Sequence, residues 1–76
     1  MEQQFADALF TSALFQDDSA GCIGMRLFVR EQGETTRKAE ITYWDATGHF
    51  YVETFGDVPL QILERLLSEA KDAIKA

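Results

Sequence analysis

The chain holds one cysteine and one histidine, Cys22 and His49, which form a conceivable pair for nucleophilic chemistry. A thiol beside an imidazole can act as nucleophile and general base, and Asp45 is close enough in sequence to orient the ring of His49. No motif for an oxyanion site, no glycine loop for phosphate and no metal-ligand spacing accompanies them. A single thiol and a single imidazole are also too few for a structural zinc site. We therefore expect a protein that is not an enzyme and that holds no metal or cofactor.

A second group of residues suits binding. Aromatic and basic side chains recur through the middle of the chain, and the candidate binding residues are Arg26, Phe28, Trp44, His49, Tyr51 and Phe55. Aromatic rings and arginine are enriched in the cores of protein interfaces. Aromatic rings on a sheet face also stack the bases of single-stranded nucleic acid. What these residues can do depends on whether the fold collects them on one surface.

Residues 38–55 are predicted to form a β-hairpin around Asp45-Ala46-Thr47-Gly48. Two alternating runs flank this link, which suits a type I turn closed by a left-handed glycine. Pairing of Trp44 with His49 sets the register and separates two faces. One face carries Ala39, Ile41, Tyr43, Phe50 and Val52, and the other carries Glu40, Thr42, Trp44, His49, Tyr51 and Glu53.

Residues 22–30 alternate in the same way and predict a third strand. The polar link 31–36 reads as a longer hairpin turn centred on glycine. Register then pairs Val29 with Ala39, Leu27 with Ile41 and Met25 with Tyr43, which keeps the apolar residues on one side. The opposite side is predicted to carry the rows Gly24–Trp44–His49, Arg26–Thr42–Tyr51, Phe28–Glu40–Glu53 and Arg30–Lys38–Phe55.

Helices are predicted at both ends of the chain. Apolar residues of 3–15 fall across one half of a helix. A second helix follows Gly56-Asp57-Val58-Pro59, with Asp57 as N-cap and an apolar stripe that runs from Leu60 to Ile74. Lys71 and Lys75 lie at its C-terminal end, which the helix dipole favours. The predicted fold is a single α+β domain over 1–76, ordered α-β-β-β-α: a three-stranded antiparallel meander with two helices packed on one face.

This order of elements resembles the double-stranded-RNA-binding domain, whose length is also close. The resemblance is one of topology. That family binds phosphates through a lysine cluster at the start of its second helix, where this chain reads Asp57-Val58-Pro59-Leu60-Gln61. Without those lysines, the resemblance implies a fold and no RNA binding.

Composition limits the partners. The 76 residues carry a net charge of −6, so duplex nucleic acid, which requires many lysine and arginine contacts, is not expected. The N-terminus has no signal-peptide pattern and no apolar run is long enough to span a membrane, so we expect a cytoplasmic protein. A domain this small gains stability by burying an apolar surface against another subunit.

These observations predict a small acidic binding or adaptor protein that acts through its uncovered aromatic sheet face, as a homodimer. Two alternatives remain open. The same face could bind single-stranded nucleic acid, although Glu40 and Glu53 lie in its middle. The chain could also be an acidic inhibitor that engages a basic, nucleic-acid-binding partner through Asp17 and Asp18.

Overall fold

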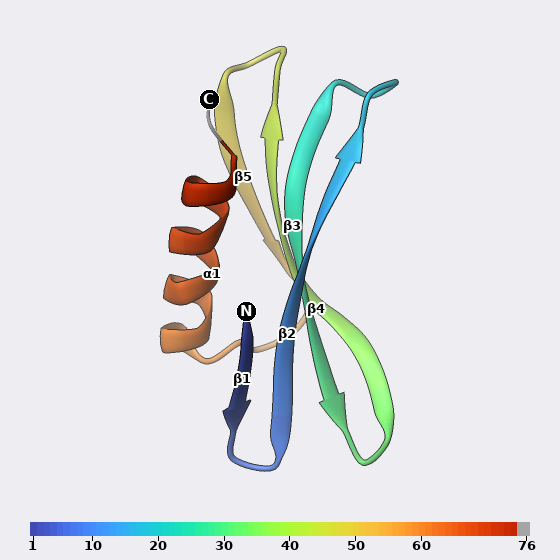
Figure 1. Cartoon of the computed structure of the whole chain (residues 1–76), viewed down its shortest axis with the longest axis vertical. Coiled ribbons are helices and arrows are strands. Elements are labelled where there is room, and N and C mark those ends of the chain that lie inside the picture. The colour runs from blue at the N-terminus through green and yellow to red at the C-terminus, as the bar shows by residue number, and fades with distance from the viewer. Residues whose placement is uncertain (75–76) are drawn as a thin grey trace.

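The computed structural model describes residues 1–74, and Figure 1 shows how they are arranged. Five strands are followed by one helix: β1 Glu2–Phe5, β2 Ala8–Asp17, β3 Cys22–Glu31, β4 Glu34–Trp44, β5 His49–Thr54 and α1 Leu60–Ala73. Lys75, which was expected to lie at the end of the helix, falls outside the described residues.

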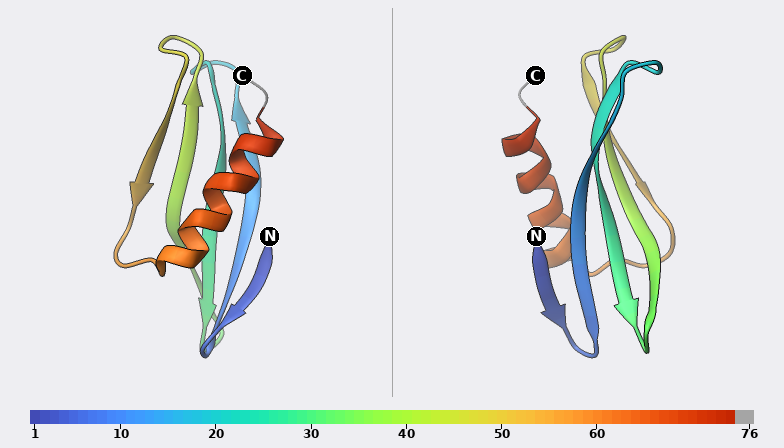
Figure 2. Two further views of the ribbon diagram at one scale, coloured as in Figure 1. Left: turned by 90° about the vertical axis from the view of Figure 1, so that its left-hand side faces the viewer. Right: turned by 45° about the vertical axis from the view of Figure 1, so that its right-hand side comes forward.

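The strands form one antiparallel sheet in the order β1-β2-β3-β4-β5, so each strand pairs with its neighbour in sequence. The predicted three-stranded meander with two helices is therefore wrong. The order is β-β-β-β-β-α, and the topological resemblance to the double-stranded-RNA-binding domain fails with it. Helix α1 runs diagonally across one face of the sheet, and no other segment of residues 1–74 covers the opposite face (Figure 2). We call that opposite face the open face.

The predicted N-terminal helix is the hairpin β1–β2. Ala8 and Phe10 are buried under α1, whereas Leu9 and Thr11 point to the open face. The odd-numbered and the even-numbered residues of β2 both include apolar side chains. The same sequence pattern therefore fits a helix and a strand that is partly covered on both sides. The pairing partner decides between them, because β2 satisfies the backbone groups of β3 along nine residue pairs.

The β4–β5 hairpin has the predicted register, with Trp44 opposite His49 and Ile41 opposite Val52. Gly48 has a φ of 70°, and its N–H donates to the carbonyl of Trp44 at 2.8 Å, as the predicted turn requires.

The predicted register between β3 and β4 is wrong by two residues from Cys22 to Leu27 and by three from Phe28 to Glu31. Met25 pairs with Ile41 and Leu27 with Ala39. The cause is the turn: Gln32 and Gly33 both have positive φ, 51° and 81°, and form a two-residue connection in place of the longer loop. An irregularity at Leu27/Phe28 then shifts the rest of the pairing. Between Cys22 and Leu27 the pairing differs from the predicted one by two residues. Because this is an even number, the side chains of β3 keep their predicted faces.

The core lies between α1 and the sheet. Ile62, Leu66 and Ala70 recur every four residues along α1 and are buried against Leu27 and Ile41, among others. The predicted stripe is confirmed except at Leu60, which is 70% exposed, and at Ala73, which is exposed; Ile74, its last member, is buried. The predicted N-cap is wrong: Pro59 occupies that position, and its carbonyl accepts the N–H groups of Ile62 and Leu63. Within residues 1–74, no helix is both long and apolar enough to cross a membrane.

A polar cluster joins α1 to the first two strands. The N-terminal ammonium of Met1 lies 2.9 Å from the Glu69 carboxylate and 2.6 Å from the Ser12 hydroxyl, which itself donates to Glu69. Burial raises the pKa of Glu69, but the hydrogen bonds from Ser12 and the ammonium outweigh this effect and hold it below its usual value.

We expect Glu69→Gln to destabilise the fold by about 1 kcal/mol at pH 7. The lowered pKa means that Glu69 contributes stability above the pKa it has in the unfolded chain, and that this contribution is lost as pH falls through the folded pKa. Urea denaturation of wild type and variant should therefore differ at pH 7 and converge near pH 3. Glu64→Gln is the control, because Glu64 is exposed on the same helix and has no ion pair among residues 1–74. Equal losses in both variants at pH 7 would contradict a role for the cluster.

Candidate functional site

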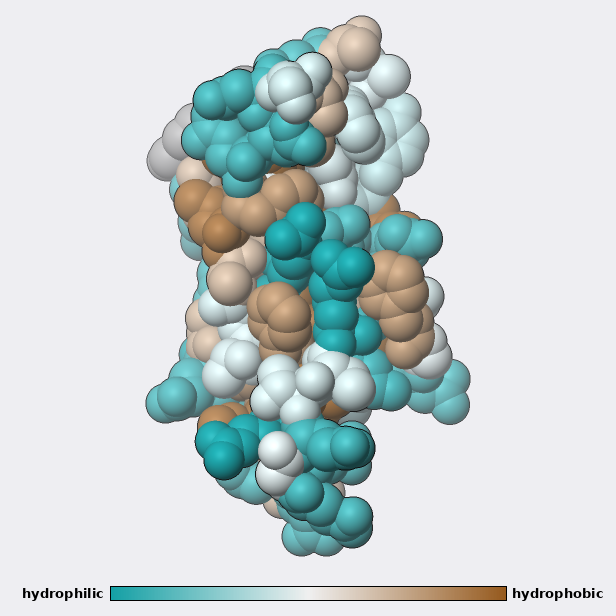
Figure 3. Space-filling view, turned by 90° about the vertical axis from the view of Figure 1, so that its right-hand side faces the viewer, coloured by the Kyte–Doolittle hydropathy of each residue, from teal (hydrophilic) through white to brown (hydrophobic). Residues whose placement is uncertain are grey.

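The open face collects the predicted binding residues. Alternation along β3, β4 and β5 directs Arg26, Phe28, Trp44, His49 and Tyr51 to it, and Phe55 follows at the end of β5. Trp44 is 37% exposed, Phe55 40% and Tyr51 47%. Figure 3 looks onto this side and shows hydrophobic side chains in the middle, divided by a strongly hydrophilic group, with hydrophilic residues at both ends. Three exposed aromatic rings on one face of a small domain are a feature of contact surfaces.

The order of the residues across the face differs from the predicted rows because β3 is displaced by two residues. The row that contains Trp44 and His49 begins with Cys22, and Gly24 joins Thr42 and Tyr51. Arg26 lies opposite Glu40 rather than Thr42, and Phe28 lies opposite Arg37. The displacement brings a cation beside an acid in the centre of the face, which the predicted register did not.

That central pair is part of a charged network. Arg26 Nε donates to Glu40 Oε1 at 2.8 Å, and Arg37 Nη1 lies 3.7 Å from the same oxygen. Each guanidinium also lies over a ring: Arg26 is 4.1 Å from the centroid of Phe15, and Arg37 is 5.6 Å from that of Phe55. Both arginines are therefore held in place by a carboxylate and an aromatic ring before any ligand arrives.

A pocket opens beside this network, between the ring of Phe15 and that of Trp44. Its cavity volume is about 350 Å³, and its lining residues are Phe15, Gln16, Asp17, Ala20, Cys22, Arg26, Glu40, Thr42 and Trp44. We call it the open-face pocket.

Phe15 is the member of the site that sequence reasoning missed, because 3–15 was assigned to a helix. Its ring lies against Gly24, directly opposite on β3. A Cβ added to Gly24 would come 2.5 Å from two atoms of that ring and would also meet the carbonyl oxygen of Ile41. The signal in the sequence was a glycine inside an otherwise well-formed strand, which marks a close approach by another group.

Cys22 and His49, the candidate nucleophile and base, do not meet. Trp44 pairs with Cys22 on one side and with His49 on the other, so the two residues lie two strand spacings apart, roughly 9–10 Å. Burial, with smaller contributions from the charges of Asp17, Glu40 and Asp45, raises the pKa of the Cys22 thiol. Both facts disfavour a thiolate nucleophile at neutral pH.

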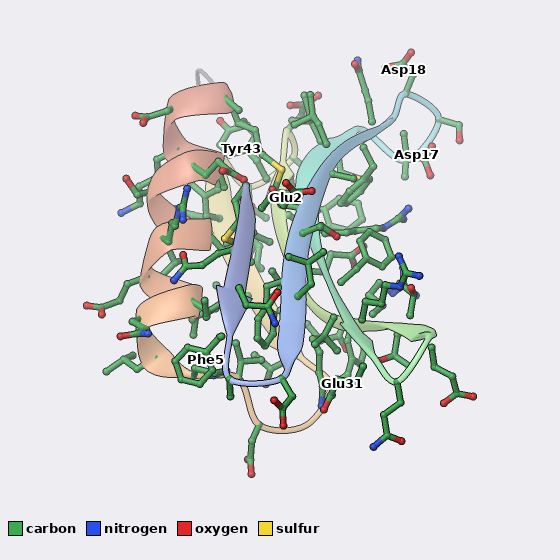
Figure 4. All side chains as sticks on the ribbon, turned by 60° about the horizontal axis from the view of Figure 1, so that its bottom comes forward. Glu2, Phe5, Asp17, Asp18, Glu31 and Tyr43 are labelled. Carbon is green, nitrogen blue, oxygen red and sulfur yellow. The ribbon has the colours of Figure 1, made fainter. Side chains whose placement is uncertain are left out.

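The Asp17-Asp18 turn, treated in the sequence as a separate feature, lies at the same end of the sheet as the pocket. Asp45 N–H donates to the carbonyl of Gly21 at 3.0 Å and ties the β2–β3 turn to the β4–β5 turn. Asp17 accepts hydrogen bonds from Ser19 Oγ and Ala20 N, and the Ser19 bond is the largest cause of its lowered pKa. Figure 4 shows Asp17 and Asp18 at this end and Glu31 near the other.

Among the residues that the structure describes, no three acidic, cysteine or histidine side chains are grouped to hold a metal ion. No protein-family model, curated protein or solved structure matches the chain. Its function therefore has to be argued from the open face itself.

Proposed function

We propose that the chain is a small cytosolic binding protein without enzymatic activity, which acts through its open face in contact with a second copy of itself. The observation that carries this proposal is the one-sided covering of the sheet: α1 seals one face, while exposed aromatic rings and ordered arginines occupy the other. Burying such a surface would stabilise a domain whose own core is small.

The chemistry of the face supports a protein partner. Aromatic rings and arginine are the residue types that interface cores enrich. The charged groups at its centre, Arg26 and Arg37 with Glu40 and Glu53, sum to zero, so another surface can cover them without burying a net charge. Glu53 lies directly opposite Glu40, and the two arginines offset the repulsion between these acids.

Single-stranded nucleic acid is the weaker candidate for this face. Arg26 and Arg37 are both engaged with Glu40, so contact with a phosphate would require them to leave a carboxylate. The net charge of −6 also opposes a polyanion at long range.

The test is the solution mass of the wild type and of Trp44→Ala/Tyr51→Ala, measured by light scattering across a concentration series. We expect a wild-type dimer whose dissociation constant rises at least tenfold in the double variant, since buried aromatic anchors at interfaces are commonly worth about 2 kcal/mol or more. Far-UV circular dichroism should show that the variant remains folded, because both side chains are exposed.

Val52→Ala is the matched control. Val52 and Tyr51 are neighbours on β5 and both are 47% exposed, but Val52 points to the face that α1 covers. The control should dimerise like the wild type; if it dissociates as readily as Trp44→Ala/Tyr51→Ala, the edge of β5 and not the open face forms the contact. A monomeric wild type would contradict the proposal. Binding of a single-stranded oligonucleotide at low salt would then assign the face to nucleic acid.

A further inference from the structure

We propose that the two copies pack their open faces with their strands running end to end in opposite directions, so that Arg30 of each copy enters the open-face pocket of the other. This inference rests on the proposed homodimer and specifies its geometry. The occupant of the pocket is a guanidinium group, and it comes from the second copy.

The two ends of the open face differ in charge. The end with the pocket, which we call the acidic end, carries Asp17, Asp18 and Asp45 on its two turns and no lysine or arginine. At the other end, residues 28–38 around the β3–β4 turn hold three bases and two acids, and Asp7 on the β1–β2 turn is a third acid, so the charges there cancel. Because this end holds cations and the acidic end holds none, we call it the basic end. Two copies stacked in the same direction would place the three acids of one acidic end against those of the other, whereas opposite directions pair the acidic end with the basic end twice.

Arg30 is the cation at the basic end that is available for such a contact. It is exposed and, among residues 1–74, has no ion-pair partner, unlike Arg26 and Arg37, which both contact Glu40. Alternation along β3 directs its side chain to the open face. A long arginine side chain at the edge of the open face, without an ion-pair partner in its own subunit, can reach a second subunit.

The pocket offers what a guanidinium requires. The ring of Trp44 forms one wall and can take a cation against its face. The carboxylate of Asp17 supplies a charged acceptor, and the hydroxyl of Thr42 is a further acceptor in the lining. Arg26 already occupies the ring of Phe15, so the ring of Trp44 is the wall that a second cation can use.

The positions along β3 agree with a two-fold axis through the middle of the face. Gly24 lies beside the pocket, and both Gly24 and Arg30 are three residues from Leu27 along β3. A two-fold axis that lies between the two sheets and crosses the strands at Leu27 therefore places Arg30 of the second copy over the Gly24 row. The separation of six residue steps between them corresponds to about 20 Å along the strand. The same axis keeps the strands of the two sheets within about 30° of each other, as face-to-face packing of twisted sheets requires.

The face is large enough for a stable contact. Four of its strands span roughly 19 Å across, and the longest run about 33 Å, so each copy presents roughly 600 Å² in projection. Two copies would bury at least about 1,200 Å², the lower bound for specific interfaces.

Charge reversal at the two ends tests the arrangement. Arg30→Glu makes both ends acidic, and Asp18→Lys/Asp45→Lys leaves neither end with a net negative charge. Asp17 is left unchanged because it caps its own turn. Sedimentation or light scattering at about 50 mM salt, where surface charges act over roughly 10 Å or more, gives the dimer dissociation constants. We expect each variant to dimerise at least tenfold more weakly than the wild type. An equimolar mixture of the two should dimerise more tightly than either variant alone, because one Arg30 then meets an unaltered pocket. The triple variant that combines them in one chain has no Arg30 and should remain weak.

Net charge alone predicts a different result. Arg30→Glu changes the net charge from −6 to −8, and Lys71→Glu on α1 does the same away from the open face, so it serves as the control and should dimerise like the wild type. Asp18→Lys/Asp45→Lys changes the net charge from −6 to −2, which should favour association if only overall repulsion mattered.

The outcomes separate this inference from the proposed function. Variants that dimerise within twofold of wild type, while Trp44→Ala/Tyr51→Ala dissociates, would overturn the end-to-end arrangement and leave the open-face dimer standing. Failure of the mixture to dimerise more tightly than either variant alone would also overturn it. A monomeric wild type would overturn the proposed homodimer, and the arrangement with it.

Discussion

Leu66→Ala is expected to destabilise the fold by about 2–5 kcal/mol, the range for truncating a buried leucine. Leu66 is fully buried at the centre of α1, between Ile62 and Ala70. A single helix seals the whole core, so little else can collapse into the space that the leucine vacates. A domain of this length is stable by roughly 4–11 kcal/mol, and the variant should therefore be close to unfolding at 37 °C.

Urea denaturation followed by far-UV circular dichroism measures this loss. Leu60→Ala provides the comparison, since it makes the same chemical change at the first residue of the same helix, at a side chain that is 70% exposed. We expect a change of less than about 0.5 kcal/mol there. Similar losses at both positions would mean that burial of the side chain against the sheet does not set the cost of the substitution, since alanine is the better helix former.

The parts of the fold that could be predicted from the sequence are those in which local chemistry and packing agree. The β4–β5 hairpin has one glycine suited to its turn and two faces of different polarity, so its register follows from the residues. Helix α1 has a proline at its start and an apolar stripe of helical period, and both fix its extent within a few residues.

The errors arise where several arrangements satisfy the same pattern. Residues 8–15 carry apolar side chains in both alternating sets, and only the pairing with β3, far along the chain, makes them a strand. The β3–β4 register depends on the turn at Gln32, which adopts a positive φ. A positive φ is uncommon for glutamine, so the residue type does not predict this turn. The two-residue turn at this position changes which residues of β3 and β4 lie opposite each other along both strands.

For the candidate site, the face was predicted correctly but the contacts between its residues were not. Its residues were placed on the correct face because a slip of two positions preserves the alternation. Its internal contacts were not predictable from the assumed register: the Arg26–Glu40 ion pair needs the observed one, and the wall formed by Phe15 needs β2 to be a strand. The pocket, and with it the link between the acidic turns and Trp44, emerges only when both corrections are made.

Gly24→Ala is expected to destabilise the fold by about 1–3 kcal/mol, even though alanine is ordinarily a mild replacement for glycine in a strand. The added methyl group would lie 2.5 Å from the Phe15 ring and would also press on the carbonyl of Ile41. The ring can rotate away, at the cost of its contact with Arg26, whereas the carbonyl belongs to the neighbouring strand β4 and cannot move independently. The substitution therefore tests whether the pocket wall and the sheet are packed as one unit.

A double-mutant cycle with Phe15→Ala separates the two contacts. Removing the ring should make Gly24→Ala less costly by more than about 0.5 kcal/mol, the limit within which independent sites add. The remainder is then the cost of crowding the Ile41 carbonyl. If Gly24→Ala costs the same in both backgrounds, Phe15 does not rest on Gly24 in solution. The pocket would then lack one wall, and the arginine contact proposed for the dimer would lose the cavity on which it depends, while exposed Trp44 and Tyr51 would still be available for a less specific association of the open faces.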